Sequence, residues 1–314
     1  MSYVSTKSMI KVQNLTKYYS EKAAINGLNF QINKGEVVGL LGLNGSGKTT
    51  TIRILSGFLI PNEGEVWIDE LNSFSDPLEI KRKVGYLPET PPLYEDFTVS
   101  EYLEFVAHLK GISNSAEEIA RVCQRTNLVE VKDNYISHLS LGFRKRVGIA
   151  QAILGTPKIV IMDEPISGLD PKQIVEIRHL IKNLASEHTV IISSHILSEV
   201  YLVCDRFLFL QEGKLVYDYS RAQLEEEMQK LSVLQIGLRS TSKLACQAFL
   251  EDISTESEVK LVEETNDYYL FSVKPKNIDS YRQQLLLGLH TKDFQLELLK
   301  KEDLTLEQFF INRI

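Results

Sequence analysis

Apolar residues form short, uninterrupted runs in the first two-thirds of the chain, separated by polar or glycine-rich segments. Runs rich in Val, Ile and Leu are typical of strands buried on both faces of a parallel sheet. Residues 9–33 alternate between apolar and polar, which predicts antiparallel strands, and residues 98 to about 134 have helical spacing. The pattern predicts an α/β fold with an antiparallel β-subdomain, a parallel-sheet core and a helical subdomain. We expect buried strands at 36–41, 159–162 and 189–193, and a turn at 62–65 that leads into a strand at 66–69.

The pattern changes after residue 217, where a charged helical segment leads into a second unit. Its order of strand, helix, strand, strand, helix and strand predicts a small α+β domain of the ferredoxin-like type. We place the boundary between a first domain of residues 1–218 and a C-terminal accessory domain of residues 219–314. A regulatory or dimer-stabilising role and a simple packing appendage are equally open for the second domain. The elements are expected at 222–230, 233–238, 242–250, 259–262, 268–273, 279–289 and 294–298, with a closing helix near 304–310.

Composition restricts the class of protein. With 314 residues, of which 43% are hydrophobic and 25% charged, the chain can build one large core and a smaller one. Its net charge of −7 does not favour nucleic acid as a partner. The first nine residues contain no apolar h-region and no apolar run approaches the roughly 20 residues that cross a bilayer, so we expect a chain that neither spans a membrane nor is exported. The three cysteines lack C-x-x-C spacing and are expected in the core of a protein in a reducing cytoplasm: Cys123, Cys204 and Cys246.

A phosphate-binding loop lies between the first buried run and a segment with helical spacing. It matches G-x-x-x-x-G-K-[ST], in which glycines let backbone N–H groups turn toward phosphate oxygens at the start of a helix. Lys48 supplies a positive charge for the β- and γ-phosphates, and the Thr49 hydroxyl is the expected Mg²⁺ ligand. The predicted ATP-binding residues are Gly42, Leu43, Asn44, Gly45, Ser46, Gly47, Lys48, Thr49 and Thr50, the last of which extends the helix.

Two acids and a histidine follow the other buried strands. Asp163 and Glu164 end the run at 159–162, next to the expected position of the phosphate loop. We expect Asp163 to hold Mg²⁺ through water and Glu164 to orient or deprotonate the attacking water. His195 follows the strand at 189–193, and a neutral imidazole there can donate to a γ-phosphate oxygen. Glu164, His195 and Lys48 are therefore the predicted catalytic residues.

These motifs occur in the order found in the nucleotide-binding domain of ABC transporters, which residues 9 to about 218 resemble. The resemblance implies that Tyr19 stacks on adenine, with Tyr18 as a fallback and an ordinary strand-edge aromatic as the alternative. It implies that Ser140 and Gly142, in the signature Leu139–Phe143, contact the γ-phosphate held by a second copy across a dimer. Asp170 matches the acidic residue of the loop that links the two sites.

The chain departs from the family pattern in two places. The signature usually reads Leu-Ser-Gly-Gly-Gln, and here Leu141 and Phe143 replace a small residue and the amide. A basic run such as Arg144 to Arg146 often follows this kind of signature in the ATPases of drug, antibiotic and gliding-type exporters. Glu89 stands where the family has a Gln that ligates Mg²⁺, so an oxygen ligand remains but carries a full charge. Neither change removes Lys48, Asp163, Glu164 or His195, so we expect hydrolysis.

The resemblance implies the ATPase subunit of an ABC transporter, an exporter, that acts as a dimer on separate membrane permease subunits at the cytoplasmic face. The second ATPase subunit is expected to be a copy of this chain. The stretch from Glu89 to Phe97 is a candidate contact for the permease, through Leu93, Tyr94 and Phe97, although an internal loop packing on its own domain would look the same. The alternative is a soluble ABC ATPase of translation or DNA repair, whose relatives usually carry two cassettes or a coiled-coil insertion. The cargo cannot be inferred from this chain.

Overall fold

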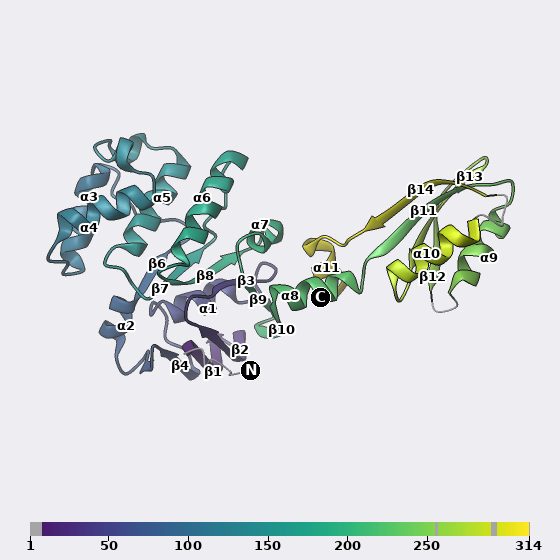
Figure 1. Cartoon of the computed structure of the whole chain (residues 1–314). Helices are drawn as coiled ribbons and strands as arrows, with labels where there is room; N and C mark the ends of the chain where they lie inside the picture. The colour runs from purple at the N-terminus through teal and green to yellow at the C-terminus, as the bar shows by residue number, and fades with distance from the viewer. Residues whose placement is uncertain (1–7, 255–256, 290–293, 314) are drawn as a thin grey trace, which may run out of the picture. The chain divides into compact units, whose positions relative to one another are not determined.

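The computed structural model describes residues 8–254, 257–289 and 294–313 (Figure 1). The chain divides into two compact units, Met1–Arg221 and Ala222–Ile314. The boundary predicted after residue 218 falls inside β10 (Lys214–Ser220), which pairs with β9 (Arg206–Gln211) over its whole length. The last strand of the first unit therefore continues to Ser220.

An antiparallel sheet forms one part of the first unit, as the alternation of residues 9–33 predicts. The predicted turn at 62–65 is wrong, because the strand already begins at Glu63 and pairs with the first strand through a register shift between Gln13 and Thr16. Gly64, at φ 88°, forms the bulge, and a Cβ atom there would lie 2.4 Å from the Asn14 carbonyl oxygen. The sheet order is β2-β1-β4-β5, with β1 at Ser8–Tyr19, β2 at Lys22–Asn33, β4 at Glu63–Ile68 and β5 at Leu71–Asn72.

A six-stranded sheet forms the core of the first unit, in the order β10-β9-β3-β8-β7-β6. All its strands are parallel except β10, and the buried runs predicted from the sequence form β3, β7 and β8. Helix α1 contacts β7 and β8, and α7 contacts β3 and β8. Because β3, β8 and β7 run parallel to one another, their carboxyl ends lie at one edge of the sheet. The bounds are β3 Val37–Leu41, β6 Val84–Leu87, β7 Ile159–Asp163, β8 Thr189–Ser194, α1 Lys48–Leu55, α2 Pro77–Lys83, α6 Pro171–Leu184 and α7 Leu197–Tyr201.

The helical subdomain predicted between 98 and about 134 is confirmed. Helix α3 contacts α4 and α5, and α5 also contacts β6 of the core sheet. The side chain and backbone of Thr98 form a capping box with Glu101 at the start of α3. The bounds are α3 Val99–Leu109, α4 Ser115–Arg125 and α5 Leu141–Ile153, with 3₁₀ turns η1 at Val129–Val131 and η2 at Ile136–His138.

The second unit has the element order expected of a ferredoxin-like domain. Its four antiparallel strands have the order β12-β13-β11-β14. Burial alternates along β11 and β13, and the buried face packs on α9 and α10 through a core that includes Phe249, Phe271 and Tyr281 (Figure 1). The bounds are α8 Arg221–Gln229, β11 Val233–Arg239, α9 Lys243–Ile253, β12 Glu258–Thr265, β13 Tyr268–Lys274, α10 Ile278–Leu289, β14 Gln295–Glu302 and α11 Leu306–Arg313.

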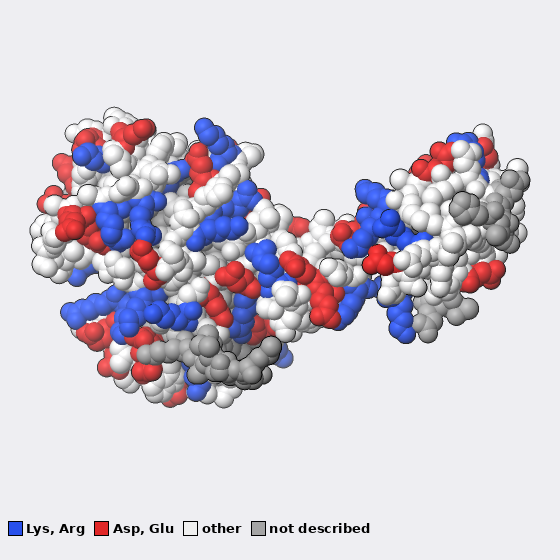
Figure 2. All heavy atoms as spheres, in the orientation of Figure 1, with Lys and Arg blue, Asp and Glu red and all other residues white. Residues whose placement is uncertain are grey.

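The cysteines lie in the core, and charged side chains of both signs lie on the surface (Figure 2). Cys123, Cys204 and Cys246 are unpaired and buried, as predicted for small core residues. Within the described ranges, no helix is both long and apolar enough to cross a membrane. Figure 2 shows Lys and Arg side chains interspersed with Asp and Glu on the visible face of each unit.

Candidate functional site

The phosphate loop joins the end of β3 to the start of α1, as predicted. Gly47 is the N-cap of α1 at φ 104°, and a Cβ atom there would lie 2.7 Å from the Ala24 carbonyl oxygen. A Cβ atom on Gly42 would lie 2.4 Å from the Leu210 carbonyl oxygen. The buried hydroxyl of Ser46 has no hydrogen-bond partner within the described residues. A tight glycine loop before a helix, whose first N–H groups are free, fits a phosphate group.

A cavity of about 510 Å³ opens at this loop and gathers residues from five segments of the chain. Tyr19 lies at the end of β1, Glu89 follows β6, Glu164 follows β7 and His195 follows β8. Sequence reasoning missed the residues of β2 that complete the wall, although Lys22 pairs with Tyr19 in the β1–β2 hairpin. The predicted residues that line the cavity are Tyr19, Asn44, Gly45, Gly47, Lys48, Thr49, Thr50, Glu89, Glu164 and His195, and the added ones are Lys22, Ala23 and Ala24.

Lys48 is the first residue of α1, and its side chain reaches back across the loop. Its Nζ donates to the carbonyl oxygens of Gly42, at 2.7 Å, and Leu43, at 3.1 Å. Burial lowers the pKa of the Lys48 amine, while the carboxylates of Glu164 and Asp163 act in the opposite direction. The ammonium is therefore held within the loop and faces two acids.

Asp163 and Glu164 occupy different environments at the end of β7. Asp163 is buried and accepts a hydrogen bond from the Ser193 hydroxyl, and it does not line the cavity itself. Burial raises the pKa of Asp163, whereas the hydrogen bond from Ser193 opposes that rise. Glu164 has a φ of 49°, which is uncommon for a residue with a side chain, and its carboxylate lines the cavity. The strained backbone turns the second acid toward the cavity.

His195 contacts Glu164 directly, with its Nδ1 at 2.8 Å from Oε2 of the carboxylate. Because an ionised carboxylate only accepts hydrogen bonds, Nδ1 carries the proton in this contact. The other nitrogen, Nε2, is then an acceptor in a neutral ring. A neutral His195 that keeps this contact cannot also donate to a phosphate oxygen, so donation to both groups requires the imidazolium form. The imidazole is half exposed and lines the cavity.

The signature residues lie outside the cavity of their own chain. Ser140 is the N-cap of α5 and accepts a weak hydrogen bond of 3.4 Å from the Phe143 N–H. Asp170 is the N-cap of α6 and accepts from the Gln173 N–H at 2.9 Å. Gly142 packs against the Gln173 side chain, since a Cβ atom there would lie 2.6 Å from it. The two helix starts adjoin one another and are available to a group outside this chain.

Lys145, which sequence reasoning did not assign, lies between the two acidic segments. It is only 3% exposed, and its Nζ donates to the carbonyl oxygens of Glu89, at 2.5 Å, and Glu164, at 3.1 Å. In the sequence Lys145 is only one member of the basic run Arg144 to Arg146, and its burial on α5 becomes visible only in the structure.

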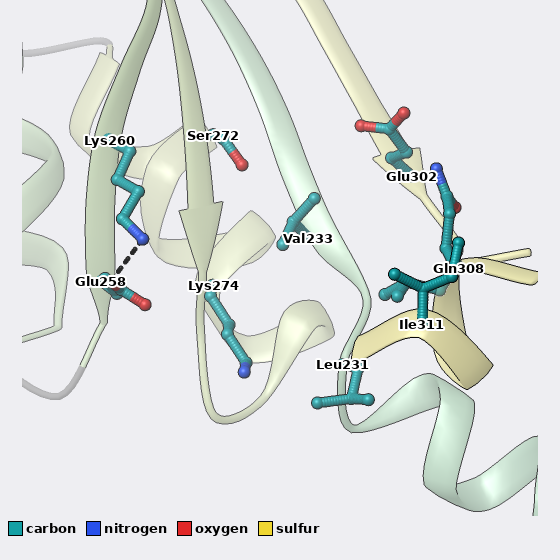
Figure 3. Close-up of a pocket in the computed structure, with 10 residues that line it drawn as sticks. Leu231, Val233, Glu258, Lys260, Ser272, Lys274, Glu302, Gln308 and Ile311 are labelled. Carbon is teal, nitrogen blue, oxygen red and sulfur yellow. Dashed lines mark ion pairs between the residues drawn. The ribbon is translucent and has the colours of Figure 1, made fainter. Parts of the chain in front are cut away.

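A second cavity, of about 650 Å³, lies within the C-terminal unit (Figure 3). Its charged lining is largely paired, since Lys260 forms an ion pair with Glu258 and Gln235 donates to Glu302. Among the described residues that line it, none forms an arrangement of nucleophile, acid and base. Throughout the described part of the chain, no group of three or more His, Cys, Asp or Glu side chains is arranged to hold a metal ion. The phosphate-loop cavity is therefore the better site for chemistry.

The sequence of this chain is similar to those of ATP-binding proteins of transporters. A family model described as ABC transporter matches residues 25–167. The bacitracin transport ATP-binding protein BcrA of Bacillus licheniformis is 37% identical over 234 residues, which are 73% of this chain and 76% of that protein. The lantibiotic transport ATP-binding protein SrtF of Streptococcus pyogenes is 36% identical over 223 residues, 70% of this chain and 95% of that protein.

The fold of this chain is also similar to that of a solved ATP-binding cassette. The dimeric post-hydrolysis structure of the ATP-binding cassette MJ0796, bound to ADP and Pi, has a TM-score of 0.62 and 27% identity, and covers 68% of this chain and 99% of that one. The fold and site are those of a P-loop ATPase with a phosphate loop, an acidic strand end and a signature helix. The chain belongs to the ABC transporter family as an ATP-binding, ATP-hydrolysing protein.

Proposed function

We propose that this chain powers an ABC exporter as a dimer that acts on separate permease subunits at the cytoplasmic face of the membrane. The observation that carries the proposal is the meeting of Lys48, Glu164 and His195 with the exposed Thr49 hydroxyl in one cavity. Two relatives are ATP-binding proteins of bacitracin transport and of lantibiotic transport, which supports a peptide antibiotic as the cargo.

The nucleotide-binding roles follow from the geometry. The N–H groups at the start of α1 and the Lys48 ammonium bind the phosphates, and the glycines of the loop leave the room they need. Tyr19, which is 48% exposed at the cavity rim, stacks on the adenine ring. Tyr18 is also partly exposed but does not line the cavity, so Tyr19 is preferred.

The donor set also fits Mg²⁺, a cation that prefers oxygen ligands and is usually held by few protein groups together with phosphates. Thr49 and Glu89 line the cavity, and Asp163 lies beside Glu164. Thr49 would bind the ion directly, Asp163 through water, and Glu89 through its carboxylate. When bound, the ion neutralises charge on the phosphate oxygens.

Glu164 is the general base in this proposal. Its carboxylate faces the cavity and its orientation is held by the contact with His195. The carboxylate orients and deprotonates a water molecule, and His195 contacts the γ-phosphate through Nε2 when protonated. The two residues therefore act as a linked pair.

The signature residues complete the site of a second copy. Ser140 and Gly142 lie at the start of α5, where a helix N-terminus attracts phosphate, and Asp170 lies at the adjoining start of α6. The dimeric state of the MJ0796 cassette supports pairing of two such chains. Leu141 is 48% exposed at this surface, so its side chain is free to move away from a phosphate group.

A permease would dock beside the helical subdomain. A cleft of about 570 Å³ lies next to the segment after β6, and its lining includes Phe58, which is 70% exposed, and Tyr86. Tyr94, which is half exposed, packs its ring 5.6 Å from that of Phe97 and 5.5 Å from that of Phe105. The loop thus packs on its own domain and still presents aromatic surface, which suits an interface.

The test of catalysis is Glu164→Gln in the full chain with its permease. Loss of a general base predicts a fall in ATP turnover by a factor of about 10²–10⁴, with ATP binding retained. The control is Glu130→Gln, on the exposed turn η1, which should keep the wild-type rate. Near-normal turnover in the Glu164 variant would remove this residue from its role.

The same variant tests the partner. Tagged Glu164→Gln protein, isolated from membranes with ATP and Mg²⁺, should bring down a polytopic membrane protein in stoichiometric amount. Recovery of ribosomes or nucleic acid instead would contradict the transporter proposal. Uptake of a labelled peptide antibiotic by inside-out vesicles, dependent on ATP, then tests the outward direction.

A further inference from the structure

Lys145 is a buried charge in a position that links the parts of the ATPase. It lies on α5, the helix that Ser140 caps, and is 3% exposed. A buried ammonium is unfavourable unless its donors and its charge are satisfied. The partners of Lys145 therefore explain why a lysine is tolerated there.

Those partners come from two segments that are distant in sequence. The Lys145 Nζ donates to the carbonyl oxygen of Glu89, 56 residues earlier, at 2.5 Å. It also donates to the carbonyl oxygen of Glu164, 19 residues later, at 3.1 Å. One side chain thus connects the signature helix with the segments that follow β6 and β7.

The backbone of Glu164 is held from both sides. Its N–H lies 3.1 Å from the Ser193 carbonyl oxygen and 3.2 Å from the Ser193 hydroxyl, and its carbonyl oxygen accepts from Lys145 and, at 3.3 Å, from the Ser167 N–H. Its φ of 49° is sparsely populated by residues with side chains and persists only when neighbouring groups fix it. The direction of the carboxylate depends on this backbone, so Lys145 contributes to it.

The charges nearby favour the ammonium form. Burial lowers the pKa of Lys145, and the carboxylates of Glu89, Glu164 and Asp163 counteract the effect. Helix α5 contacts β6, and Lys145 contacts the segments that follow β6 and β7. The lysine therefore ties the helix that Ser140 caps to the backbone of Glu164.

We propose that Lys145 is a positioning residue that holds the backbone of Glu164 and so keeps its carboxylate oriented for hydrolysis. This inference rests on the proposed function, in which Glu164 is the general base. Lys145 makes the contact from α5, the helix that Ser140 caps, so the signature helix of the same chain supports the base. Loss of the contact leaves the Glu164 backbone less firmly held and its carboxylate less well directed toward water.

The test compares Lys145→Met and Lys145→Gln in the full chain with its permease. The Met variant removes the donor and should lower kcat by at least about tenfold while the KM for ATP changes by less than about twofold. The Gln variant keeps N–H donors without the charge and should recover part of the rate. Lys182→Met, an exposed residue of α6, is the matched control and should behave as wild type.

A double-mutant cycle separates a positioning role from a general structural one. Because Lys145 is proposed to act through Glu164, Lys145→Met should cause no further loss of single-turnover rate in a Glu164→Gln background. Losses that multiply would overturn the inference. A wild-type kcat in Lys145→Met would also overturn the inference. So would a Lys145→Gln variant that loses as much kcat as Lys145→Met, if both variants show a matching fall in thermal stability.

The two proposals fail in different ways. A wild-type complex that does not hydrolyse ATP would overturn the proposed function. A wild-type complex that hydrolyses ATP, together with a Lys145→Gln and a Lys145→Met variant of equal wild-type rate, would overturn this inference alone.

Discussion

At the residue scale, Asp69 joins three elements of the first unit through two lysines. Its Oδ2 accepts from Lys83 Nζ, at 2.5 Å, and from Lys158 Nζ, at 2.6 Å. Asp69 follows β4, Lys83 ends α2 and Lys158 precedes β7. Burial alone would raise the pKa of Asp69, but the hydrogen bonds from Lys158 and Lys83 outweigh it and lower the pKa to about 2. The carboxylate is therefore charged at all ordinary pH values.

This depressed pKa predicts a stability that depends on pH. A group whose folded pKa lies below its unfolded value of about 3.9 stabilises the fold above that value and loses its contribution as pH falls toward 2. Asp69→Asn should lower the free energy of unfolding by about 1–2 kcal/mol at pH 7. This range is smaller than the full pKa shift implies, because solvent screens the ion pair with the half-exposed Lys158. The difference from wild type should shrink between about pH 4 and pH 2.

Urea unfolding followed by the fluorescence of the single tryptophan, Trp67 in β4, measures the difference directly. Asp133→Asn, in an exposed loop, serves as the control. A difference that stays constant from pH 7 to pH 3 would show that the ion pair is not its source.

The same scale shows which site residues a sequence can reveal. Lys48, Glu164 and His195 meet in the cavity because each ends a strand or starts a helix, positions that hydrophobic patterns mark. Lys145 was missed because its partners lie 56 and 19 residues away, and local periodicity does not encode which carbonyl a buried amine reaches. The sequence also could not predict which ring nitrogen of His195 carries the proton, since this depends on the contact with Glu164.

At the element scale, helix α3 starts the helical subdomain and depends on its first turn. The Thr98 hydroxyl accepts from the Glu101 N–H at 3.3 Å, and the Thr98 N–H donates to the Glu101 carboxylate at 2.8 Å. Thr98→Ala removes the side-chain half of this capping box and should lower the free energy of unfolding by about 1 kcal/mol. Urea denaturation followed by circular dichroism checks this, with Ser113→Ala in the exposed loop before α4 as the control. A Thr98 variant as stable as wild type would show that tertiary packing alone fixes the helix start.

Element types were easier to predict than element boundaries. The elements described in the C-terminal unit follow the predicted order, because burial alternates along β13 and each of α9 and α10 buries one face in the core. The strand predicted at 66–69 begins three residues earlier, at Glu63. Its start was missed because Gly64 is typical of a turn, and only the pairing with β1 shows that it forms a bulge. The boundary after 218 was placed within β10 for a similar reason, since the pairing with β9 is not visible in the pattern of β10 alone.

At the scale of the whole molecule, the two halves of the proposed ATP site lie apart in one chain. The cavity of Lys48 and Glu164 does not include Ser140, Gly142 or Asp170. The signature residues lie instead at two adjoining helix starts. If two copies pair so that each cavity faces the other copy's signature, both half-sites are used and the assembly is closed by a twofold axis. The sequence implies this arrangement only through family resemblance, because no pattern within one chain specifies a second copy.

Mixed dimers test this pairing. One chain carries Lys48→Ala and the other Ser140→Asp, a change that keeps a good N-cap on α5 and places a negative charge against phosphate. Dimers of either variant alone should be inactive. If the half-sites act across the interface, the mixed dimer has both defects in one site and none in the other, and it should retain roughly half of the wild-type ATPase rate. If each chain used its own signature, both sites would be defective and the mixed dimer would be inactive.

A second combination gives the opposite outcome and so serves as the control. A chain with both Lys48→Ala and Ser140→Asp is paired with a wild-type chain and isolated by two different tags. Action across the interface leaves one defect in each site and predicts an inactive dimer, whereas action within one chain leaves one site intact. Activity in the second combination, and none in the first, would therefore assign both half-sites to a single chain and exclude the twofold arrangement.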